Sequence, residues 1–319
     1  MVRYAVITGC SKSSIGYIAA RVLAGPTYDF KVILACRDEQ KGKEAESSII
    51  SESPESKVTF VKLDLASFSS IRNFVTELRE LDDNAIEKQG LDILVNNAGI
   101  ARGSTAPYCE TEDGLEEIVG VNHFGHFLLT NLLLDDIKRA EKSRIVVVSS
   151  GLHDPNTRKK EGEADQLLLP SFPDGILQTS DKYDGMLAYR VSKLCNLWFA
   201  YELQRLLRDT SVAVNAVSPG FIPATGLARR SDGFTWFVLQ YVFEPLRYLG
   251  LLSFVRSPED GGKAIVEACV GSVAGEGGQY LSLPKGAETL EGQKSSAESY
   301  DENKAAELWK MSMRVCKLE

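Results

Sequence analysis

Short apolar runs alternate along this chain with longer stretches whose apolar residues recur at helical spacing. Most of the runs are rich in β-branched residues and are not interrupted by polar positions. Such runs are typical of strands that are buried on both faces of a parallel sheet. The predicted strands are Tyr4–Ile7, Lys31–Ala35, Val58–Leu63, Leu91–Val95, Arg144–Val148, Val212–Val217 and Gln279–Leu283.

Between the runs, the apolar spacing predicts amphipathic helices, as for Ile18, Ala19, Val22 and Leu23. A strand followed by a helix, repeated along the chain, indicates an α/β fold with a doubly wound sheet and right-handed crossovers. The 319 residues show no internal repeat and no low-complexity linker, and α/β folds of this length often form one domain. We therefore predict a single domain over residues 1–319, with helices on both faces of a parallel sheet.

Three segments interrupt this alternation. Residues 152–182 are polar and contain proline, which predicts a long surface insertion. Residues 224–255 follow the sixth predicted strand and are strongly apolar. Residues 286–319 form a C-terminal extension, which begins with a polar stretch and ends in a predicted helix over residues 300–317.

Composition narrows the classes of partner and location. The net charge of −8 argues against a nucleic-acid partner, because proteins that bind nucleic acids present a basic surface. The six cysteines form no CxxC pair and the histidines number only three, so we predict free thiols and no metal site. The chain enters a predicted strand at once, and Glu244, Pro245 and Arg247 interrupt its most apolar segment. We therefore expect neither a signal peptide nor a transmembrane helix, and a location in the cytoplasm or on the cytosolic face of a membrane.

The motif TGCSKSSIG joins the first predicted strand to a predicted helix. A helix N-terminus offers unpaired N–H groups and a partial positive charge, which suit a pyrophosphate. In this motif a glycine after the strand permits a tight turn, a second glycine permits close packing of the helix, and serines can add hydroxyl donors. By itself the loop fits an ordinary capped turn equally well. The candidate binding residues of the loop are Gly9, Ser11, Lys12, Ser14 and Ile15.

The end of the second predicted strand bears on the choice of cofactor. NAD sites place an acidic residue there for the ribose 2′-hydroxyl, whereas this chain has Cys36 followed by Arg37. A guanidinium suits a 2′-phosphate by charge and by its planar shape, and Lys12 could reach the same phosphate. We therefore predict NADP(H). Asp38 is the competing feature, because it would reach the ribose if the strand ended two residues later.

Tyr189 and Lys193 lie four residues apart in AYRVSK, so a helix would place them on one face. A tyrosine with its usual pKa of about 10 exchanges protons poorly near neutrality, and a nearby ammonium lowers that pKa by stabilising the phenolate. The pair could therefore act as a general acid/base on a carbonyl or an alcohol. A YxxxK pattern alone also fits a pair of residues on a helix surface.

Small and polar residues follow three other predicted strands, at the edge where open α/β sheets place their ligands. The small residues of NNAG would let a ring approach closely, and a further asparagine lies in the helix before the fifth strand. These candidates are Asn96, Asn97, Ala98, Gly99, Asn122, Ser149, Ser150, Pro219, Gly220 and Thr225.

The ordered set of motifs resembles the short-chain dehydrogenase/reductase family. The set is TGxxxxxIG, the aspartate of KLDL, NNAG, the VN of VNHFGH, SS, YxxxK and PG, and it extends from Val2 to about Leu283. The resemblance implies a Rossmann-type domain with seven parallel strands. The long separation of Ser150 from Tyr189, together with ILACRD and PATGL, is similar to the retinol-dehydrogenase-like and protochlorophyllide-reductase-like branches. The glycine loop departs from the family pattern, because it is one residue longer and has serine where a middle glycine is usual.

The resemblance implies a role for each residue that matches a motif. Tyr189 would be the catalytic acid/base, Lys193 would lower its pKa and bind the nicotinamide ribose, and Ser150 would polarise the substrate oxygen. Asn122 would hold a water molecule in the proton relay. The remaining implied contacts are Asp64 and Leu65 at the adenine, Asn97 at the ribose, and Ile222 and Thr225 at the nicotinamide. The family also implies a homodimer.

In this family the segment after the sixth strand covers the substrate. Here that segment, residues 224–255, is rich in aromatic residues and leucine, which suits a lipophilic substrate. An ordinary core, a dimer face and a patch that contacts a membrane surface are the alternatives.

The leading hypothesis is an NADPH-dependent oxidoreductase that acts on a carbonyl or alcohol of a hydrophobic, retinoid-, steroid- or polyketide-like small molecule. Reduction of a C=C bond, of protochlorophyllide or enone type, is an alternative that would use the same tyrosine and lysine. A sensor or scaffold that binds NADP(H) without turnover is a third reading, and the intact set of Asn122, Ser150, Tyr189 and Lys193 argues against it.

Overall fold

One mixed sheet forms the centre of the protein. The computed structural model describes residues 2–158, 176–223, 246, 248, 252, 255–283 and 289–319. The strands lie in the order β3-β2-β1-β4-β5-β6-β7-β8. Their bounds are β1 (Arg3–Thr8), β2 (Phe30–Cys36), β3 (Val58–Lys62), β4 (Ile93–Asn96), β5 (Arg144–Val148), β6 (Ala213–Ser218), β7 (Tyr280–Ser282) and β8 (Glu291–Gly292).

Strands β1 to β7 pair in parallel, as predicted, while β8 pairs with β7 in the antiparallel direction. The prediction of about seven strands missed β8, because its two residues are exposed and carry no apolar signal. The predicted parallel strands are buried nearly throughout, as are all six residues of β6. Their continuous apolar runs follow from helices that cover both faces of the sheet.

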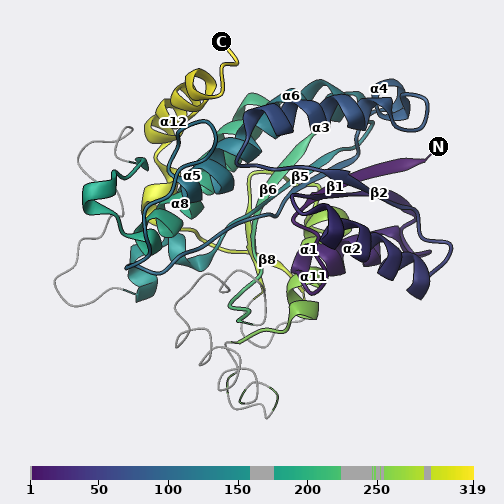
Figure 1. Cartoon of the computed structure of the whole chain (residues 1–319), viewed down its shortest axis with the longest axis horizontal. Coiled ribbons are helices and arrows are strands. Elements are labelled where there is room, and N and C mark those ends of the chain that lie inside the picture. The colour runs from purple at the N-terminus through teal and green to yellow at the C-terminus, as the bar shows by residue number, and fades with distance from the viewer. Residues whose placement is uncertain are drawn as a thin grey trace.

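The helices form a layer on each side of the sheet (Figure 1). Helices α1, α2 and α11 share one buried core with the sheet, and α3, α6 and α8 share the other. The helix bounds are α1 (Ile15–Ala24), α2 (Glu39–Glu52), α3 (Phe68–Glu80), α4 (Ala85–Gln89), α5 (Glu117–Val119), α6 (His126–Leu132), α7 (Leu134–Arg139), α8 (Gly185–Leu206), α11 (Pro258–Val270) and α12 (Glu302–Val315). The shorter helical turns are the π-helical η1 (Gly120–Gly125) and the 3₁₀ turns η2 (Gly151–His153), η3 (Pro155–Arg158), η5 (Ser180–Lys182) and η8 (Ala297–Tyr300).

The strand order places a crevice at a defined position. Strand β1 pairs with β2 on one side and with β4 on the other. The order in which successive strands are added to the sheet therefore reverses at β1. Ligands of open α/β sheets bind at such a switch point, beyond the carboxyl ends of the strands. The segments that follow β1, β4, β5 and β6 are therefore the ones from which a site would be built.

The C-terminal extension lies against helix α8, on the outside of one helical layer (Figure 1). The side chain of Trp309 stacks on Phe199 of α8, with ring centroids 6.1 Å apart. The indole of Trp198 donates a hydrogen bond of 3.1 Å to the carbonyl of Glu298. Of the other two predicted additions, most of the insertion at 152–182 and most of the apolar segment at 224–255 lie outside the described residues.

Candidate active site

The loop after β1 is shaped by two glycines that contact the segment after β4. Gly9 has a φ of +76°, and a Cβ added to it would lie 2.9 Å from the Cα of Ala98. A Cβ on Gly16 would lie 2.5 Å from the side-chain nitrogen of Asn97. Any larger residue would therefore push the loop away from the end of β4. Both glycines are required for the close approach that the sequence predicted.

The serines of this loop organise its turn into α1. Ser14 is the N-cap of α1, where its hydroxyl oxygen accepts from the N–H of Tyr17 at 3.0 Å and its O–H donates to the carbonyl of Gly9 at 2.9 Å. That hydroxyl is engaged inside the loop, whereas the sequence suggested a donor to phosphate. Ser13 adopts the left-handed region with a φ of +72°, in the part of the loop where a glycine was expected. The side chain of Lys12 is exposed.

Asn97 connects the loop after β4 to the end of β1. Its amide nitrogen donates to the carbonyl of Thr8 at 2.6 Å. The Thr8 hydroxyl in turn accepts from the backbone N–H groups of Asn97 and Ala98, at 2.9 and 2.8 Å. The side-chain oxygen of Asn97 is buried and has no hydrogen-bond partner among the described residues. A buried acceptor without a donor fits the hydroxyl of a ribose, so the residues present suit a dinucleotide.

The end of β2 supports the position predicted for the cofactor's ribose. The strand ends at Cys36, and the exposed Arg37 follows it. Asp38 caps α2: its carboxylate accepts from the N–H of Lys41 at 3.1 Å and forms an ion pair with the Lys41 ammonium at 3.2 Å. These contacts direct the carboxylate to its own helix. The uncertainty about where this strand ends is thereby removed in favour of Cys36.

Asp64 and Leu65 follow β3 at the same edge of the sheet. The Asp64 carboxylate accepts from the N–H of Ala66 at 3.0 Å. Leu65 is buried, and its carbonyl oxygen lies 2.5 Å from where a Cβ on Gly125 would be. The π-helical turn η1 therefore packs directly against the segment predicted to border the adenine.

Helix α8 presents Tyr189 and Lys193 on one face, as the spacing predicts. The Lys193 ammonium lies 5.6 Å from the centroid of the Tyr189 ring. Both side chains are buried. Burial raises the pKa of Tyr189 to about 12, although the hydrogen bond with the Ser150 hydroxyl acts in the opposite direction. Tyr189 therefore holds its proton at neutral pH.

Lys193 is held by the end of β5. Its ammonium donates to the carbonyl of Val148 at 3.1 Å, and its own carbonyl accepts from the Ser149 hydroxyl at 2.8 Å. Burial lowers the pKa of Lys193 to about 8, since the charged form is poorly solvated. A Cβ on Gly99 would lie 3.5 Å from the Lys193 ammonium. Three predicted site elements, at the ends of β4 and β5 and on α8, thus meet at this lysine.

Asn122 lies in η1 and joins these elements through its side chain. Its oxygen accepts from the N–H of Ile100 at 2.8 Å, and its nitrogen donates to the carbonyl of Ile100 at 2.9 Å and to the Ser192 hydroxyl at 3.0 Å. Asn122 therefore fixes the loop after β4 against α8. Its predicted role in holding a water molecule stays a prediction.

The segment after β6 approaches α1 through helix α11. Pro219 is buried, and Gly220 has a φ of +88°, which only glycine adopts without strain. A Cβ on Gly261 of α11 would lie 2.3 Å from Ile222 and 2.7 Å from Ile15. Ile222 and Ile15 are therefore brought to one side of the crevice. Thr225 lies outside the described residues.

Comparison with known proteins identifies a family model and several similar proteins. A sequence model of the short chain dehydrogenase family matches residues 3–157. Retinol dehydrogenase 14 of Mus musculus is 36% identical over 88% of this chain and 77% of its own length. This chain belongs to the short-chain dehydrogenase family. The protochlorophyllide reductase of Avena sativa is 32% identical over 97% of this chain and 98% of its own length.

Solved structures of short-chain dehydrogenases share this fold. An uncharacterized protein from Mycobacterium paratuberculosis superposes with a TM-score of 0.70 at 30% identity, over 99% of this chain and 93% of that one. The NADPH-bound carbonyl reductase from chicken fatty liver superposes with a TM-score of 0.59 at 19% identity, over 88% of this chain and 96% of that one. The Rossmann-type fold expected from the motifs is thereby confirmed.

Several residues of this short-chain dehydrogenase site escaped sequence reasoning because their roles depend on distant contacts. His126 accepts from the Thr8 hydroxyl at 2.9 Å and donates to the carbonyl of Asn122 at 3.1 Å. Burial lowers its pKa to about 4. Tyr183 donates to the buried carboxylate of Glu116 at 2.9 Å, beside the apolar residues that surround Tyr189. A threonine or histidine at these positions carries no local signal.

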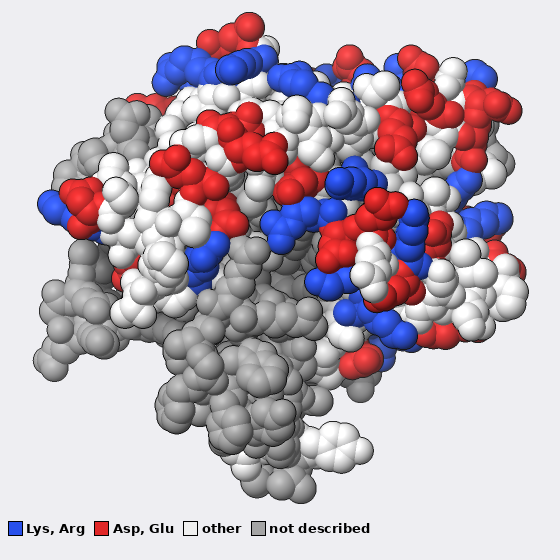
Figure 2. Space-filling view, in the orientation of Figure 1, with Lys and Arg blue, Asp and Glu red and all other residues white. Residues whose placement is uncertain are grey.

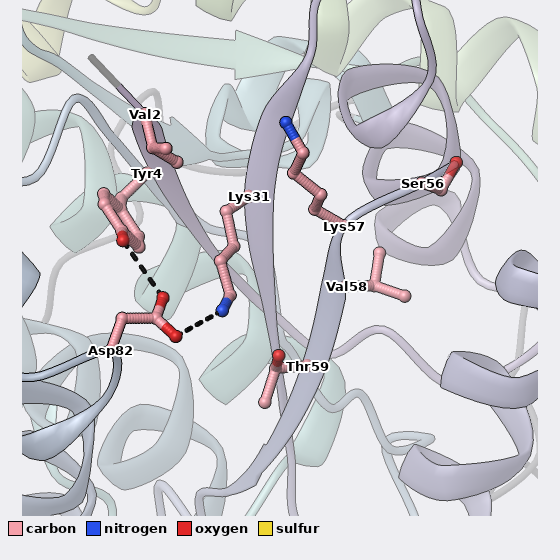
Figure 3. A pocket seen from close by; sticks show the side chains of 8 residues that line it. All are labelled: Val2, Tyr4, Lys31, Ser56, Lys57, Val58, Thr59 and Asp82. Atoms are coloured by element: carbon pink, nitrogen blue, oxygen red, sulfur yellow. Dashed lines mark hydrogen bonds and ion pairs between the residues drawn. The ribbon is translucent and has the colours of Figure 1, made fainter. Parts of the chain in front are cut away.

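The described residues on one face of the molecule carry charges of both signs. Acidic and basic side chains interleave over the face shown in Figure 2. A pocket of about 450 Å³ lies at the amino ends of β1 and β2, the edge of the sheet opposite to Tyr189 (Figure 3). Its Asp82 accepts from the Tyr4 hydroxyl at 3.0 Å and the Lys31 ammonium at 2.6 Å. These bonds join three of the polar side chains of the pocket, which lies away from the candidate site.

The described residues contain no candidate metal site and no candidate membrane-spanning helix. No group of histidine, cysteine, aspartate or glutamate within the described ranges could hold a metal ion. None of the helices over the same ranges is both long enough and apolar enough to span a membrane.

Proposed function

We propose that this short-chain dehydrogenase transfers hydride between NADP(H) and a carbonyl or alcohol group of a hydrophobic substrate. The observation that carries the proposal is the meeting of the buried Tyr189 phenol and Lys193 ammonium with the half-buried Ser150 hydroxyl. It lies at the carboxyl edge of the sheet, beside the loop that fits a dinucleotide. Such a triad can exchange a proton with an oxygen atom in a site shielded from water.

The bound nicotinamide supplies or accepts the hydride. Residues of the chain transfer the proton. The Ser150 hydroxyl hydrogen-bonds the substrate oxygen, and Tyr189 donates its phenolic proton as negative charge develops on that oxygen. The Lys193 ammonium, 5.6 Å from the centroid of the Tyr189 ring, would stabilise the resulting phenolate. Because burial raises the pKa of Tyr189 to about 12, the phenol is protonated at neutral pH and has a proton to donate to the substrate oxygen.

The preference for NADP(H) is supported by the groups at the end of β2. Arg37 is exposed at the position that follows the strand, and Asp38 is bound to its own helix. Lys12 is exposed in the neighbouring loop. Two exposed cations, beside a carboxylate that caps its own helix, suit the 2′-phosphate of NADP(H) rather than a 2′-hydroxyl.

The hydrophobic substrate is supported by the surroundings of Tyr189. Apolar side chains pack around it, among them Ile100, Leu152 and Met186. The named relatives include a retinol dehydrogenase and a protochlorophyllide reductase, and another is a polyprenol dehydrogenase. The retinoid-, steroid- or polyketide-like class, a homodimer and contact with a membrane surface remain proposals of the same kind.

A turnover assay tests this function. With NADPH, we expect kcat/KM for a bulky hydrophobic ketone or aldehyde to exceed that for acetone by at least about 100-fold, because burial of apolar area contributes about 25 cal/mol per Å². Oxidation of NADPH would be followed by absorbance across a panel of lipophilic ketones, aldehydes and enones. Equal kcat/KM values for the large and small ketones would contradict the proposed substrate class.

Reduction of a C=C bond is the second candidate. It is supported by the match to protochlorophyllide reductase, which covers nearly the whole of both chains and so includes the C-terminal segment ENKAAELWKMS. Turnover of protochlorophyllide that requires light would identify this chemistry. Turnover of saturated ketones in the dark would identify the first candidate.

A further inference from the structure

His153 lies three residues after Ser150, and its hydrogen bonds determine which ring nitrogen carries the proton. Its ring nitrogen Nδ1 is 2.7 Å from the carbonyl oxygen of Ser150, and Nε2 is 3.0 Å from the backbone nitrogen of Ser296. A carbonyl only accepts and a backbone N–H only donates. Nδ1 therefore carries the proton and Nε2 carries the lone pair. Only 2% of His153 is exposed, and burial lowers its pKa, so the ring is neutral at pH 7.

The imidazole joins three segments that lie far apart in the sequence. Ser150 ends the β5 segment and hydrogen-bonds Tyr189 through its hydroxyl. Tyr280 of β7 meets the edge of the His153 ring, with centroids 5.1 Å apart at 76°. Ser296 belongs to the C-terminal extension. The hydrogen bonds at both nitrogens and the contact with Tyr280 restrict rotation of the His153 ring. A shift of one of the three segments would therefore displace the other two.

The C-terminal extension is itself anchored on the helix that carries the catalytic tyrosine. The Tyr201 hydroxyl of α8 lies 2.8 Å from the Ser295 hydroxyl. Trp198 of the same helix bonds the carbonyl of Glu298. A continuous series of contacts therefore runs from α8 to Ser296, through the His153 ring and on to Ser150. It ends at the Ser150 hydroxyl, which hydrogen-bonds Tyr189.

We propose that His153 is a positioning residue: supported by Ser296, it fixes the Ser150 carbonyl and thereby aligns the Ser150 hydroxyl with Tyr189. This inference rests on the proposed function, because it assigns the alignment of the same catalytic pair. His153 does not touch the reacting atoms. Its effect on turnover passes through Ser150, and small displacements of a catalytic group are costly.

Two substitutions separate the two hydrogen bonds of the ring. His153→Asn keeps an amide donor near the position of Nδ1 and so retains the bond to Ser150, while it loses the bond from Ser296. His153→Gln reaches the position of Nε2 and so retains an acceptor for Ser296, while it loses the side-chain bond to Ser150 and keeps only the bond of 3.0 Å from its own backbone N–H to the Ser150 carbonyl. Tyr201→Phe is a matched control, since it removes a hydrogen bond to the same extension without touching His153 or Ser150.

We expect kcat to fall about tenfold in His153→Gln, less than the hundredfold that a misplacement of about 1 Å can cost. In His153→Asn, which keeps the bond to Ser150 but loses the support of Ser296, kcat should fall by only about threefold, and in Tyr201→Phe it should stay close to the wild-type value by the same argument. The KM for NADPH should be unchanged in all three variants. A wild-type kcat in His153→Gln, or an equal loss in the glutamine and asparagine variants, would overturn the positioning role.

Hydrogen exchange gives a readout that does not depend on turnover. The Ser296 amide should be protected in the wild type and in His153→Gln, and should lose protection in His153→Asn. An unprotected Ser296 amide in the wild type would refute the inference, even if the enzyme is active. Absence of carbonyl turnover by the wild type would instead refute the proposed function, and the exchange experiment would still decide on His153.

Discussion

Lys193 is the residue whose burial conflicts most directly with its charge. Its pKa is about 8 in the folded protein and about 10.5 when the chain is unfolded. Between these values the unfolded chain binds more protons than the folded one, so the free energy of unfolding rises with pH. From pH 8 to pH 10 this contribution amounts to about 2 kcal/mol.

Lys193→Met should remove this rise, because a methionine does not titrate. Urea unfolding of both proteins at pH 8, 9 and 10 would measure it as a difference, in which other titrating groups cancel. We expect the variant to lose turnover while its stability at pH 7 equals or exceeds that of the wild type, since an apolar side chain replaces a buried ammonium. If the free energy of unfolding changed with pH by the same amount in both proteins, the lowered pKa of Lys193 would be contradicted.

Lys12 and Arg37 determine the cofactor preference if the account of the first loop is right. A hydrogen bond to a charged group contributes about 1.5–3 kcal/mol, or roughly tenfold in affinity. Lys12→Ala combined with Arg37→Ala should therefore lower the ratio of kcat/KM for NADPH to that for NADH by about 100-fold. Lys57→Ala, which removes the exposed ion-pair partner of Asp29, is the surface control. An unchanged ratio in the double variant would refute the 2′-phosphate site.

At the scale of single residues, the sequence predicted pairs of residues that lie close together along the chain. Tyr189 and Lys193 were paired by helical spacing, and the structure places them on one face of α8. Thr8, His126 and His153 were not assigned any role, because each of them acts through partners more than a hundred residues away. Such contacts become visible only once the strands and helices have been assembled.

The π-helical turn η1 illustrates an element whose shape matters for the site. Its Gly125 faces Leu65, so that a Cβ would lie 2.5 Å from the Leu65 carbonyl. Gly125→Ala should lower the free energy of unfolding by about 1–3 kcal/mol through overpacking. It should also weaken NADPH binding, because Leu65 is predicted to border the adenine.

Gly103→Ala is the matched control for this substitution, since a Cβ there meets no heavy atom of the described protein within 4 Å. Chemical denaturation and an NADPH titration would be compared for the two variants. Wild-type stability and affinity in Gly125→Ala would show that η1 does not restrain the adenine segment.

Among the elements, the strands were predictable and the turns were not. Continuous β-branched runs placed β1 to β7 because strands covered on both faces need apolar residues throughout. The exposed pair of residues in β8 and the π-helical conformation of η1 carry no such pattern. The cap at Asp38 also lay beyond prediction, because a strand end two residues later would have given the same carboxylate a different role.

For the whole molecule, the order of motifs was sufficient to predict the fold and its family, while the course of the C-terminal extension was not. Residues 289–319 contact α8 and reach His153, three residues after Ser150. The extension therefore connects the outside of one helical layer to the segment after β5. If His153 positions Ser150 as proposed, the extension contributes to the alignment of the candidate site.

The central claim is that Tyr189 exchanges the proton while the rest of the molecule binds NADPH. Its most direct test is Tyr189→Phe, measured for turnover with NADPH and a hydrophobic ketone and for NADPH affinity by fluorescence titration. Tyr201→Phe serves as the control, because it removes a buried phenolic hydroxyl from the same helix. We predict that Tyr189→Phe loses at least about 100-fold in kcat, within the range for general acid catalysis, and binds NADPH with nearly the wild-type Kd. Full turnover in Tyr189→Phe would contradict the account.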